Sequence, residues 1–280
     1  MEIGIIGLGL IGGSLAIDFR RLGHVLVGVS QRDATRQAAL TRGIVDRATS
    51  DFATLKTADI IFLCTPLGAI SATVDQLLPH LSPHTILTDV GSVKASIVSQ
   101  IAPRWSNFVG GHPMAGKAES GLAVAEAGLF VDRAYVLTPI ETTPPEATAI
   151  VADLARSLQC RVYECDPEAH DRAVAWISHL PVMVSASLIG ACVNQPNPQV
   201  LELAQKFASS GFRDTSRVGG GTPELGVMMA QYNQAALLQS LAAYRQQLDQ
   251  ITQIIEQKDW ATLEQTLINT QQARPKFSGT

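Results

Sequence analysis

The segment Ile3-Gly4-Ile5-Ile6-Gly7-Leu8-Gly9-Leu10-Ile11-Gly12 decides the fold of this chain. It opens with a short apolar strand and leads into a helix-like run at 14–19, so the motif G-x-G-x-x-G stands between a strand and a helix. There Gly7 permits a tight turn, Gly9 lets a pyrophosphate approach the backbone and Gly12 lets the helix pack close to the strand. The positive end of the helix then faces the phosphates. The segment predicts a dinucleotide-binding domain rather than a glycine-rich turn without a ligand.

Strand-like and helix-like runs alternate over the first 165 residues. This order is typical of a parallel sheet wound on both faces, so the sequence predicts an α/β fold with an N-terminal Rossmann-type domain. Ligands of such sheets bind beyond the carboxyl ends of the strands. The expected strands are 3–6, 25–29, 59–64, 85–90, 107–109, 134–138 and 161–164. The expected cofactor contacts are Gly7, Leu8, Gly9, Leu10, Ile11 and Gly12, together with Cys64, Thr65 and Pro66 where a later strand ends.

The pattern changes after Asp166-Pro167, where long helical segments replace the alternation. We therefore predict two domains, a nucleotide-binding Rossmann domain at 1–165 and an all-helical domain at 166–280. The expected helices of the second domain are 167–192, 199–208, 223–257 and 259–272.

An apolar stripe marks one face of the expected helix 223–257. A stripe on a helix of about 30 residues must be buried, either in the core of its own domain or against a second copy of the chain. A small helical domain cannot readily cover so long a helix, which favours a homodimer with interleaved helical halves. The stripe consists of Leu237, Leu238, Leu241, Tyr244, Leu248, Ile251, Ile254 and Ile255.

Composition argues against several classes of function. The net charge is −4 and lysine and arginine form no cluster, so nucleic acids and anionic membranes are poor partners. No uninterrupted apolar run reaches the ~18 residues of a membrane span, and the N-terminal residues lack the pattern of a secretory signal. The four cysteines, Cys64, Cys160, Cys165 and Cys192, form no C-x-x-C pair. A cytoplasmic protein without a metal site or a disulfide framework is expected.

The end of the second expected strand bears on the choice of cofactor. Enzymes that use NAD usually carry Asp or Glu there to bind the ribose hydroxyls, whereas this chain has Ser30, Gln31 and Arg32. A hydroxyl and a guanidinium would bind a 2′-phosphate, so NADP is favoured over NAD. Asp33 stands one position later, and we expect it to cap the next helix at 34–40.

The stretch 110–116 sets a single imidazole, His112, among glycines and a proline after a short strand. A loop of this kind would hold the histidine beside open space, where a neutral imidazole can take a proton near pH 7. The alternative is a histidine that caps a turn and bonds only to backbone. Ser92 also follows a strand directly, so we expect both side chains at the edge of the sheet where ligands bind.

Several polar residues stand out in the helical half and near the sheet. Arg213 and Arg217 flank a turn, where a guanidinium commonly binds a carboxylate, although exposed arginines in surface ion pairs are numerous. His179 precedes Leu180-Pro181 in an apolar helix, which is typical of a core histidine. His170-Asp171 forms a further motif. For two lysines, Lys94 and Lys117, the sequence allows either binding of phosphate or substrate or simple exposure to solvent.

Taken together, the motifs resemble those of the prephenate and arogenate dehydrogenases of tyrosine biosynthesis. The resemblance spans the chain from its start to Arg217, and it implies a nucleotide-binding domain followed by a helical domain that forms a dimer. The motifs that carry it are Gly7 to Gly12, Thr88 to Lys94, Gly111 to Gly116, His170-Asp171, Ser178 to Pro181 and Gly211 to Arg217.

The resemblance also implies roles for single residues. His112 is similar to the catalytic histidine that takes the proton of the ring C4 hydroxyl as hydride leaves C4, and Ser92 to the serine that holds this hydroxyl. Arg217 is similar to the arginine that binds the ring carboxylate, and His179 to a neighbour in the same pocket. Many prephenate enzymes carry a second histidine where this chain has Val182, a difference that favours arogenate.

Together with the preference for NADP, the resemblance implies NADP-dependent oxidative decarboxylation of L-arogenate to L-tyrosine. One alternative is a prephenate dehydrogenase that forms 4-hydroxyphenylpyruvate. Another is an enzyme of the 3-hydroxyacid dehydrogenase type, but these use a lysine on a helix of the second domain, and no lysine lies between Lys117 and Lys206. A third is a sensor that binds NADP without turnover.

Overall fold

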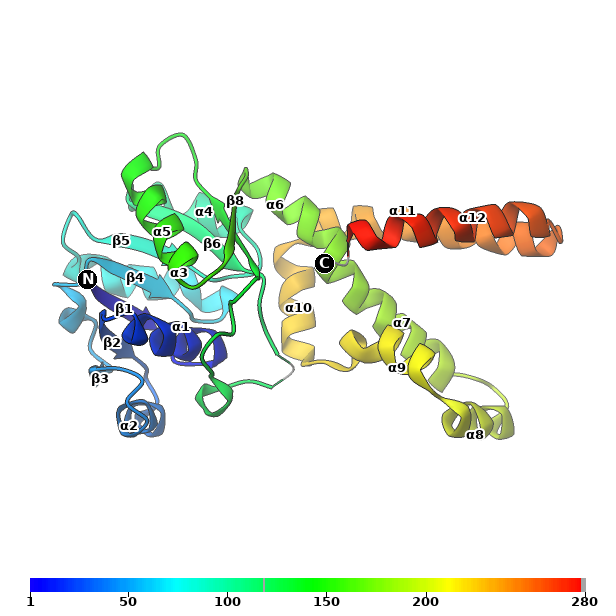
Figure 1. Cartoon of the computed structure of the whole chain (residues 1–280), viewed down its shortest axis with the longest axis horizontal. Coiled ribbons are helices and arrows are strands. Elements are labelled where there is room, and N and C mark those ends of the chain that lie inside the picture. Colours follow the sequence, from blue (N-terminus) through cyan, green and yellow to red (C-terminus); the bar gives the residue numbers. More distant parts are fainter. Residues whose placement is uncertain (118, 278–280) are drawn as a thin grey trace. The chain divides into compact units, whose positions relative to one another are not determined.

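The computed structural model describes residues 1–117 and 119–277. The chain divides into two compact units, Met1–Gln234 and Ala235–Thr280. Figure 1 follows the chain from the blue strand β1 to the red helix α12. The first unit contains the whole sheet and the helices up to α10, and the second consists of the helices α11 and α12.

Eight strands form a single sheet in the order β3-β2-β1-β4-β5-β6-β7-β8. All neighbours are parallel except β6 and β7, which are antiparallel. Strand β3 is the one that the sequence pattern did not predict, because it has only three residues. The strands are β1 (Glu2–Ile6), β2 (Val25–Val29), β3 (Arg47–Thr49), β4 (Ile60–Leu63), β5 (Ile86–Asp89), β6 (Phe108–Pro113), β7 (Ala134–Thr138) and β8 (Arg161–Glu164).

Helices cover both faces of the sheet, and one apolar core lies between each face and the helices that cover it. The first core takes Leu15 and Phe19 from α1 and Val151 from α5. The second takes Val74 from α3 and Ile97 from α4. The predicted α/β, doubly wound fold is confirmed. The helices of this part are α1 (Leu10–Arg21), α2 (Asp33–Thr41), α3 (Leu67–Leu77), α4 (Ala95–Ile101) and α5 (Pro145–Ser157).

Every regular element described after β8 is helical, in agreement with the change of sequence pattern. The domain boundary near residue 165 stays a prediction, because the compact units divide at a later point. The helices are α6 (Pro167–Val174), α7 (Leu180–Val193), α8 (Pro198–Phe207), α9 (Ser210–Ser216), α10 (Pro223–Tyr232), α11 (Gln234–Glu256) and α12 (Trp260–Ala273).

Two of the predicted helices are interrupted. The stretch 167–192 contains a π-turn at Ala175–His179. Pro181 explains it, because a proline lacks the N–H that would continue the α-helical pattern and its ring crowds the carbonyl four residues earlier. The stretch 223–257 breaks at Asn233, whose backbone leaves the helical region at φ −126° and ψ 37°. There the Asn233 amide group binds other parts of the unit instead.

Candidate active site

The glycine motif has the geometry that a dinucleotide requires. Gly7 has a φ of +97°, and a Cβ there would lie 2.6 Å from the Cys64 carbonyl oxygen. A Cβ on Gly12 would collide with the Gly7 carbonyl oxygen, so the helix α1 can approach the strand only without a side chain at this position. Around Gly9 a Cβ would meet nothing within 4 Å, which leaves the space for a pyrophosphate. The turn therefore fits a dinucleotide phosphate at the start of α1.

A buried hydroxyl without a partner lies beside this turn. Thr65 follows β4, the neighbour of β1, and its Oγ1 is buried without any hydrogen bond in the described part of the chain. Burial raises the pKa of the adjacent Cys64 thiol, which is therefore a neutral packing group. A free hydroxyl at the carboxyl end of a central strand is a suitable donor or acceptor for a bound cofactor.

The end of β2 presents one unpaired guanidinium. Arg36 donates to the carbonyls of Ser30 (2.8 Å) and Gln31 (3.1 Å) and thereby fixes this turn. The exposed Arg32 side chain has no hydrogen bond or ion pair with any residue that the structure describes. The expectation that Asp33 caps α2 is wrong. Asp33 is the first helical residue and pairs with Arg36 at 2.9 Å, because the N-cap position falls on Arg32.

His112 does not lie in a loop as the sequence suggested. It belongs to β6, where it stands opposite Val136 of the antiparallel strand β7, and it is only 7% exposed. The local sequence pattern could not reveal this, because the partner strand is more than twenty residues away. His112 still lies at the carboxyl end of β6, a strand parallel to β5, so it reaches the edge of the sheet at which the glycine motif also stands.

A chain of hydrogen bonds leads from His112 into α6. The Nδ1 atom of His112 lies 2.8 Å from Nε2 of His170, and Nδ1 of His170 lies 2.8 Å from Oδ1 of Asp171. The same carboxylate accepts the backbone N–H groups of Lys94 (2.7 Å) and Ala95 (2.9 Å). No hydrogen-bond partner occupies Nε2 of His112 among the described residues. This nitrogen is free to accept a proton from a substrate.

Burial keeps the His112 ring neutral. The pKa of His112 lies well below its ordinary value of 6.5, first because of burial and then because of the nearby His170, Lys94 and His179. A neutral imidazole is the form that acts as a general base.

Lys94 is not solvated, so that interpretation of its sequence position is wrong, whereas its binding of phosphate or substrate stays a prediction. Its side chain is fully buried, and Nζ donates to Asp89 and to the Gly111 carbonyl oxygen (2.8 Å). Burial lowers the pKa of Lys94, while Asp89 opposes that shift. Asp89 also accepts the backbone N–H groups of Gly91 and Gly111. The pair thus ties the turn after β5 to the strand that carries His112.

His179 is buried, and only one of its two ring nitrogens has a hydrogen-bond partner among the described residues. Its Nδ1 lies 3.2 Å from Nδ2 of Asn233, which also donates to the Asp171 carbonyl oxygen at 2.7 Å. Since the amide nitrogen is a donor, Nδ1 is the acceptor and Nε2 of His179 carries the proton. That Nε2 atom is buried without a partner in the described part of the chain. Burial lowers the pKa of His179 to about 4.

The remaining predicted residues lie around this cluster or apart from it. Ser92 is half-buried in the turn between β5 and α4, and its hydroxyl bonds to no described residue, His112 included. Arg213 is exposed and pairs with its neighbour Asp214 at 3.0 Å. Arg217 is exposed and has no ion pair with a described residue. Lys117 pairs with Glu126 at 2.6 Å.

Arg217 begins a 3-10 turn (Arg217–Gly220) that packs tightly on α7. A Cβ on Gly219 would collide with the Ala186 backbone nitrogen and lie 2.5 Å from the Ser185 carbonyl carbon. Ser185 Oγ donates to the Thr215 carbonyl oxygen at 2.6 Å. This packing fixes the turn of Arg217 against the helix that His179 precedes.

Sequence reasoning gave no role to His170, Asp171, Asp89 or Asn233. The adjacent pair His170-Asp171 was the available signal, because two such polar residues at a helix start require partners once buried. No group of three or more potential metal ligands occurs among residues 1–117 and 119–277.

Comparisons with known proteins agree with this geometry. The family model described as "Prephenate dehydrogenase, nucleotide-binding domain" matches residues 15–164. The model "Prephenate dehydrogenase, dimerization domain" matches residues 166–269. A prephenate dehydrogenase of Bacillus subtilis is 34% identical over 260 residues, which cover 90% of this chain and 70% of that protein.

Two solved structures are similar along almost the whole chain. An arogenate dehydrogenase of Synechocystis has 54% identity and a TM-score of 0.91, with 99% of this chain and 100% of that chain covered. A prephenate dehydrogenase from A. aeolicus, in complex with hydroxyphenyl propionate and NAD+, has 25% identity and a TM-score of 0.93. In that case 99% of this chain and 98% of the other are covered.

Proposed function

Because the chain belongs to the prephenate dehydrogenase family, we propose that it oxidises and decarboxylates L-arogenate to L-tyrosine with NADP as the cofactor. The observation that carries the proposal is the neutral, buried His112, whose free Nε2 lies at the edge of the sheet where the glycine motif also stands. The residues that would hold the cofactor are Gly7 to Gly12, the Ser30–Arg32 turn and Cys64 to Pro66.

The chemistry requires little more than orientation and a base. Bound NADP would accept hydride from ring carbon C4. As that hydride leaves, Nε2 of His112 takes the proton of the C4 hydroxyl, and Ser92 offers this hydroxyl a second hydrogen bond. The electron pair of the bond between the ring and the carboxylate moves into the ring and carbon dioxide departs. The protonated His112 then returns its proton to the ring oxygen, so that the product carries the hydroxyl of tyrosine. Aromatisation makes the step essentially irreversible.

We assign the ring carboxylate to Arg217, an unpaired guanidinium whose turn packs against α7. His179 would donate its buried Nε2–H in the same region. Arg213 is a weaker candidate, because Asp214 already occupies its guanidinium.

Arg217→Ala should raise KM for the substrate about tenfold or more with a smaller change in kcat, since a charge-assisted bond to a carboxylate contributes about 1.5–3 kcal/mol. Steady-state kinetics at saturating cofactor measure both constants. Arg274→Ala is a matched control, because Arg274 lies in the other unit. An unchanged KM in Arg217→Ala would mean that another residue binds the ring carboxylate.

Two features support arogenate as the substrate. Val182 offers no hydrogen bond to a pyruvyl side chain, and the Synechocystis relative of 54% identity is an arogenate dehydrogenase. Prephenate is the second candidate, because the Bacillus subtilis relative is a prephenate dehydrogenase.

The preference for NADP rests on Arg32, whose guanidinium is free and exposed at the end of β2. Arg32→Ala should raise the Kd for NADP about tenfold and leave the Kd for NAD within twofold, because only NADP carries the 2′-phosphate. Calorimetric titration of both cofactors measures the two constants. Arg47→Ala serves as a control on the neighbouring strand. An equal loss of affinity for NAD would mean that Arg32 does not bind the 2′-phosphate of NADP.

The pH dependence follows from the lowered pKa of His112. Because the buried ring stays neutral below its ordinary pKa of 6.5, kcat/KM should remain flat as the pH falls through 6.5 and decline only well below it. As the pH is lowered, the free energy of unfolding should begin to fall at a higher pH than kcat/KM does. In the unfolded chain, His112 and His179 bind protons near pH 6.5. In the folded chain the pKa of each is lower, about 4 for His179, so protonation below pH 6.5 favours the unfolded chain. Rate profiles and urea titrations between about pH 4.5 and 8, a range that includes the ordinary histidine pKa of 6.5, check both.

A spectrophotometric assay that crosses both substrates with both cofactors tests the proposed function. Turnover should be highest with arogenate and NADP. Turnover with prephenate alone would overturn the choice of substrate, and cofactor binding without any turnover would indicate a sensor instead.

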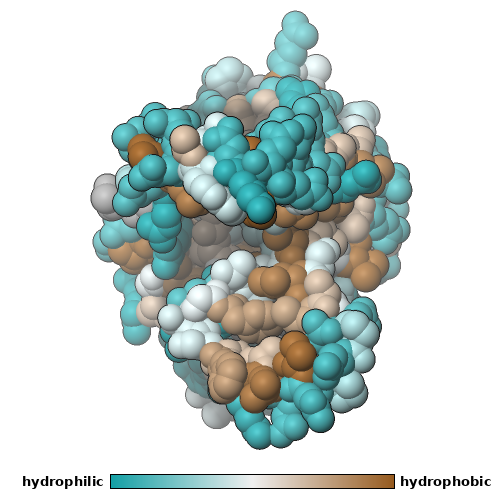
Figure 2. All heavy atoms as spheres, turned by 90° about the vertical axis from the view of Figure 1, so that its right-hand side faces the viewer, coloured by the Kyte–Doolittle hydropathy of each residue, from teal (hydrophilic) through white to brown (hydrophobic). Residues whose placement is uncertain are grey.

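We further propose that the chain forms a homodimer through its helical part and acts in the cytoplasm. The family model for the second half is that of a dimerization domain. Large apolar side chains of the helices remain exposed, among them Trp176, Ile177 and Phe207 in the first unit and Leu238, Leu248 and Trp260 in the second. Figure 2 shows apolar surface gathered between polar regions on the face that it displays. A second copy would cover such side chains.

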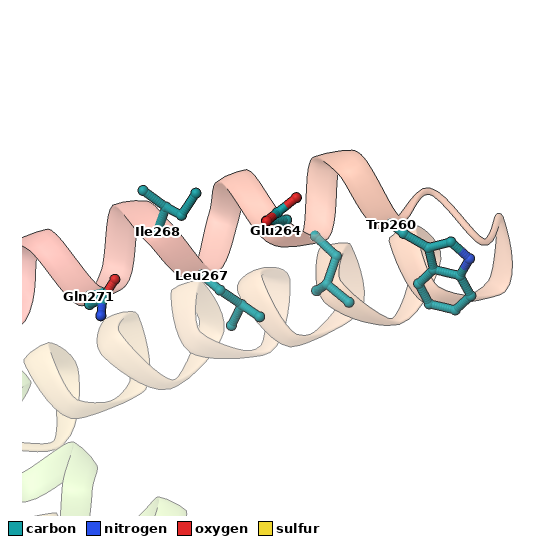
Figure 3. A pocket seen from close by; sticks show the side chains of 6 residues that line it. Trp260, Glu264, Leu267, Ile268 and Gln271 are labelled. Atoms are coloured by element: carbon teal, nitrogen blue, oxygen red, sulfur yellow. The ribbon is translucent and has the colours of Figure 1, made fainter.

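The second unit offers its own apolar groove along α12. Trp260, Leu263, Leu267 and Ile268 line it together with Glu264 and Gln271 (Figure 3). In the dimer that we propose, this groove and the stripe of α11 lie between copies.

The stretch Pro167–Val193 is long and apolar enough by composition to cross a membrane, since a window of 18 residues within it has a mean hydropathy of 1.6. The absence of an uninterrupted apolar run had suggested otherwise. Length and composition alone are weak support for a span, and the same stretch holds the polar residues His170, Asp171 and His179 in internal hydrogen bonds. A dimer interface accounts for its exposed apolar side chains.

A further inference from the structure

We propose that His170 and Asp171 are positioning residues that lock His112 in the tautomer with a proton on Nδ1 and a free electron pair on Nε2. The inference deepens the proposed function, because it assigns the origin of the base that this reaction uses. It rests on the hydrogen-bond geometry of three side chains and two backbone groups.

The donor-to-acceptor direction of this chain of hydrogen bonds is set at Asp171. The Asp171 carboxylate faces three donors, which are the backbone N–H groups of Lys94 and Ala95 and the Nδ1 atom of His170. Backbone N–H groups cannot reverse their role, so both carboxylate oxygens are acceptors. Asp171 is only 5% exposed, so solvent has little access to this set of hydrogen bonds. Nδ1 of His170 must therefore carry a proton.

That proton determines the next link. A neutral His170 ring with a proton on Nδ1 has a bare Nε2, which can only accept. Its contact at 2.8 Å is Nδ1 of His112, so this atom is the donor. A neutral His112 ring with a proton on Nδ1 is left with a free electron pair on Nε2. Without a partner, neutral imidazole in water favours the opposite tautomer, which could not take a proton at Nε2.

The charges around this chain of hydrogen bonds favour the same tautomer, and they also stabilise the proton that His112 gains during the reaction. With neutral rings, the buried cluster contains two carboxylates, Asp89 and Asp171, and one ammonium, Lys94, so its formal charge is −1. A proton that arrives on His112 brings this formal charge to zero. The developing imidazolium is thus stabilised by a group already in place, which needs no reorganisation.

The arrangement also depends on how the elements meet. Asp166 accepts the backbone N–H of Ala169 at 2.9 Å and thereby starts α6 one turn before the motif. The start of α4 supplies the two backbone donors, and β6 supplies His112. Three segments that lie far apart in the sequence therefore fix one ring, and the conformational freedom of His112 is low.

Nitrogen-15 NMR on histidine-labelled protein without substrate tests the tautomer directly. The chain has six histidines, and the His112→Asn variant identifies the His112 signals by their loss. We expect a protonated Nδ1 and a bare Nε2 on His112 at pH 7.5. In His170→Phe, which keeps a ring but removes the acceptor, the signals should move toward the opposite tautomer. In His170→Gln, whose side-chain oxygen can replace Nε2 as the acceptor, the original tautomer should return.

Turnover should follow the tautomer. His170→Phe should lower kcat roughly 10- to 100-fold, the usual effect of losing a group that orients a reacting one, and His170→Gln should recover most of that loss. NADP affinity and the thermal midpoint serve as controls for folding. A bare Nδ1 in the wild type, or equal tautomers in the Phe and Gln variants, would overturn the inference. A locked tautomer in a protein that converts neither substrate would instead reject the proposed function and leave the positioning intact.

Discussion

Replacing His112 with asparagine should lower kcat by about two to four orders of magnitude. The asparagine amide has nearly the position of the ring Nδ1, so it can keep the hydrogen bond to His170, but it places no basic nitrogen at the substrate hydroxyl. Because the ring lies among packed groups and is only 7% exposed, the smaller side chain should cause a modest loss of stability. NADP affinity should change little, since the glycine motif is untouched.

Stopped-flow measurement of NADPH formation separates this chemical step from product release. His84→Asn is the matched control, because His84 is an exposed histidine at a distance from the cluster in sequence. A His112→Asn enzyme that retained the wild-type single-turnover rate would remove His112 from the chemistry. A loss of NADP binding in the same variant would instead indicate a disturbed fold.

Replacing Lys94 with methionine should lower the free energy of unfolding by about 3 kcal/mol, because it leaves the Asp89 carboxylate buried without its cation. The two backbone N–H groups that bind Asp89 hold the effect near the lower end of the usual range. The Gly111 carbonyl oxygen also loses a donor, so the strand of His112 should be disturbed. Urea denaturation followed by tryptophan fluorescence measures the change.

Lys56→Met is the control, since Lys56 is exposed and forms no ion pair with a described residue. A similar loss in both variants would mean that the methionine side chain, rather than the bare carboxylate, is responsible. Addition of Asp89→Asn to Lys94→Met should recover part of the stability, because a neutral amide is less costly to bury than an unpaired charge.

The parts of the fold that sequence could predict are those that local rules determine. The glycine motif identified the first strand, the turn and α1, because the steric demands at Gly7 and Gly12 act within one βα unit. The alternation of apolar runs identified seven of the eight strands by position. Strand β3 escaped notice because three residues are too few for a periodic pattern.

What sequence could not predict depends on partners far away along the chain. His112 reads as a loop residue because glycine and proline surround it, yet β7 extends β6 through that stretch. Lys94 reads as a solvated or binding lysine because lysine is seldom buried, and only the placement of Asp89 beneath it makes burial possible. The break at Asn233 follows from its bonds to Asp171 and His179, which no local propensity reveals.

The buried pair of Lys94 and Asp89 limits how this sequence can change over evolutionary time. A single replacement at either position passes through a protein with one bare interior charge, so selection would remove most such intermediates before a second replacement occurred. The two positions should therefore change together or not at all among descendants of this gene. Drift would be faster at an exposed pair such as Lys206 and Glu202, where each partner can be lost at almost no cost.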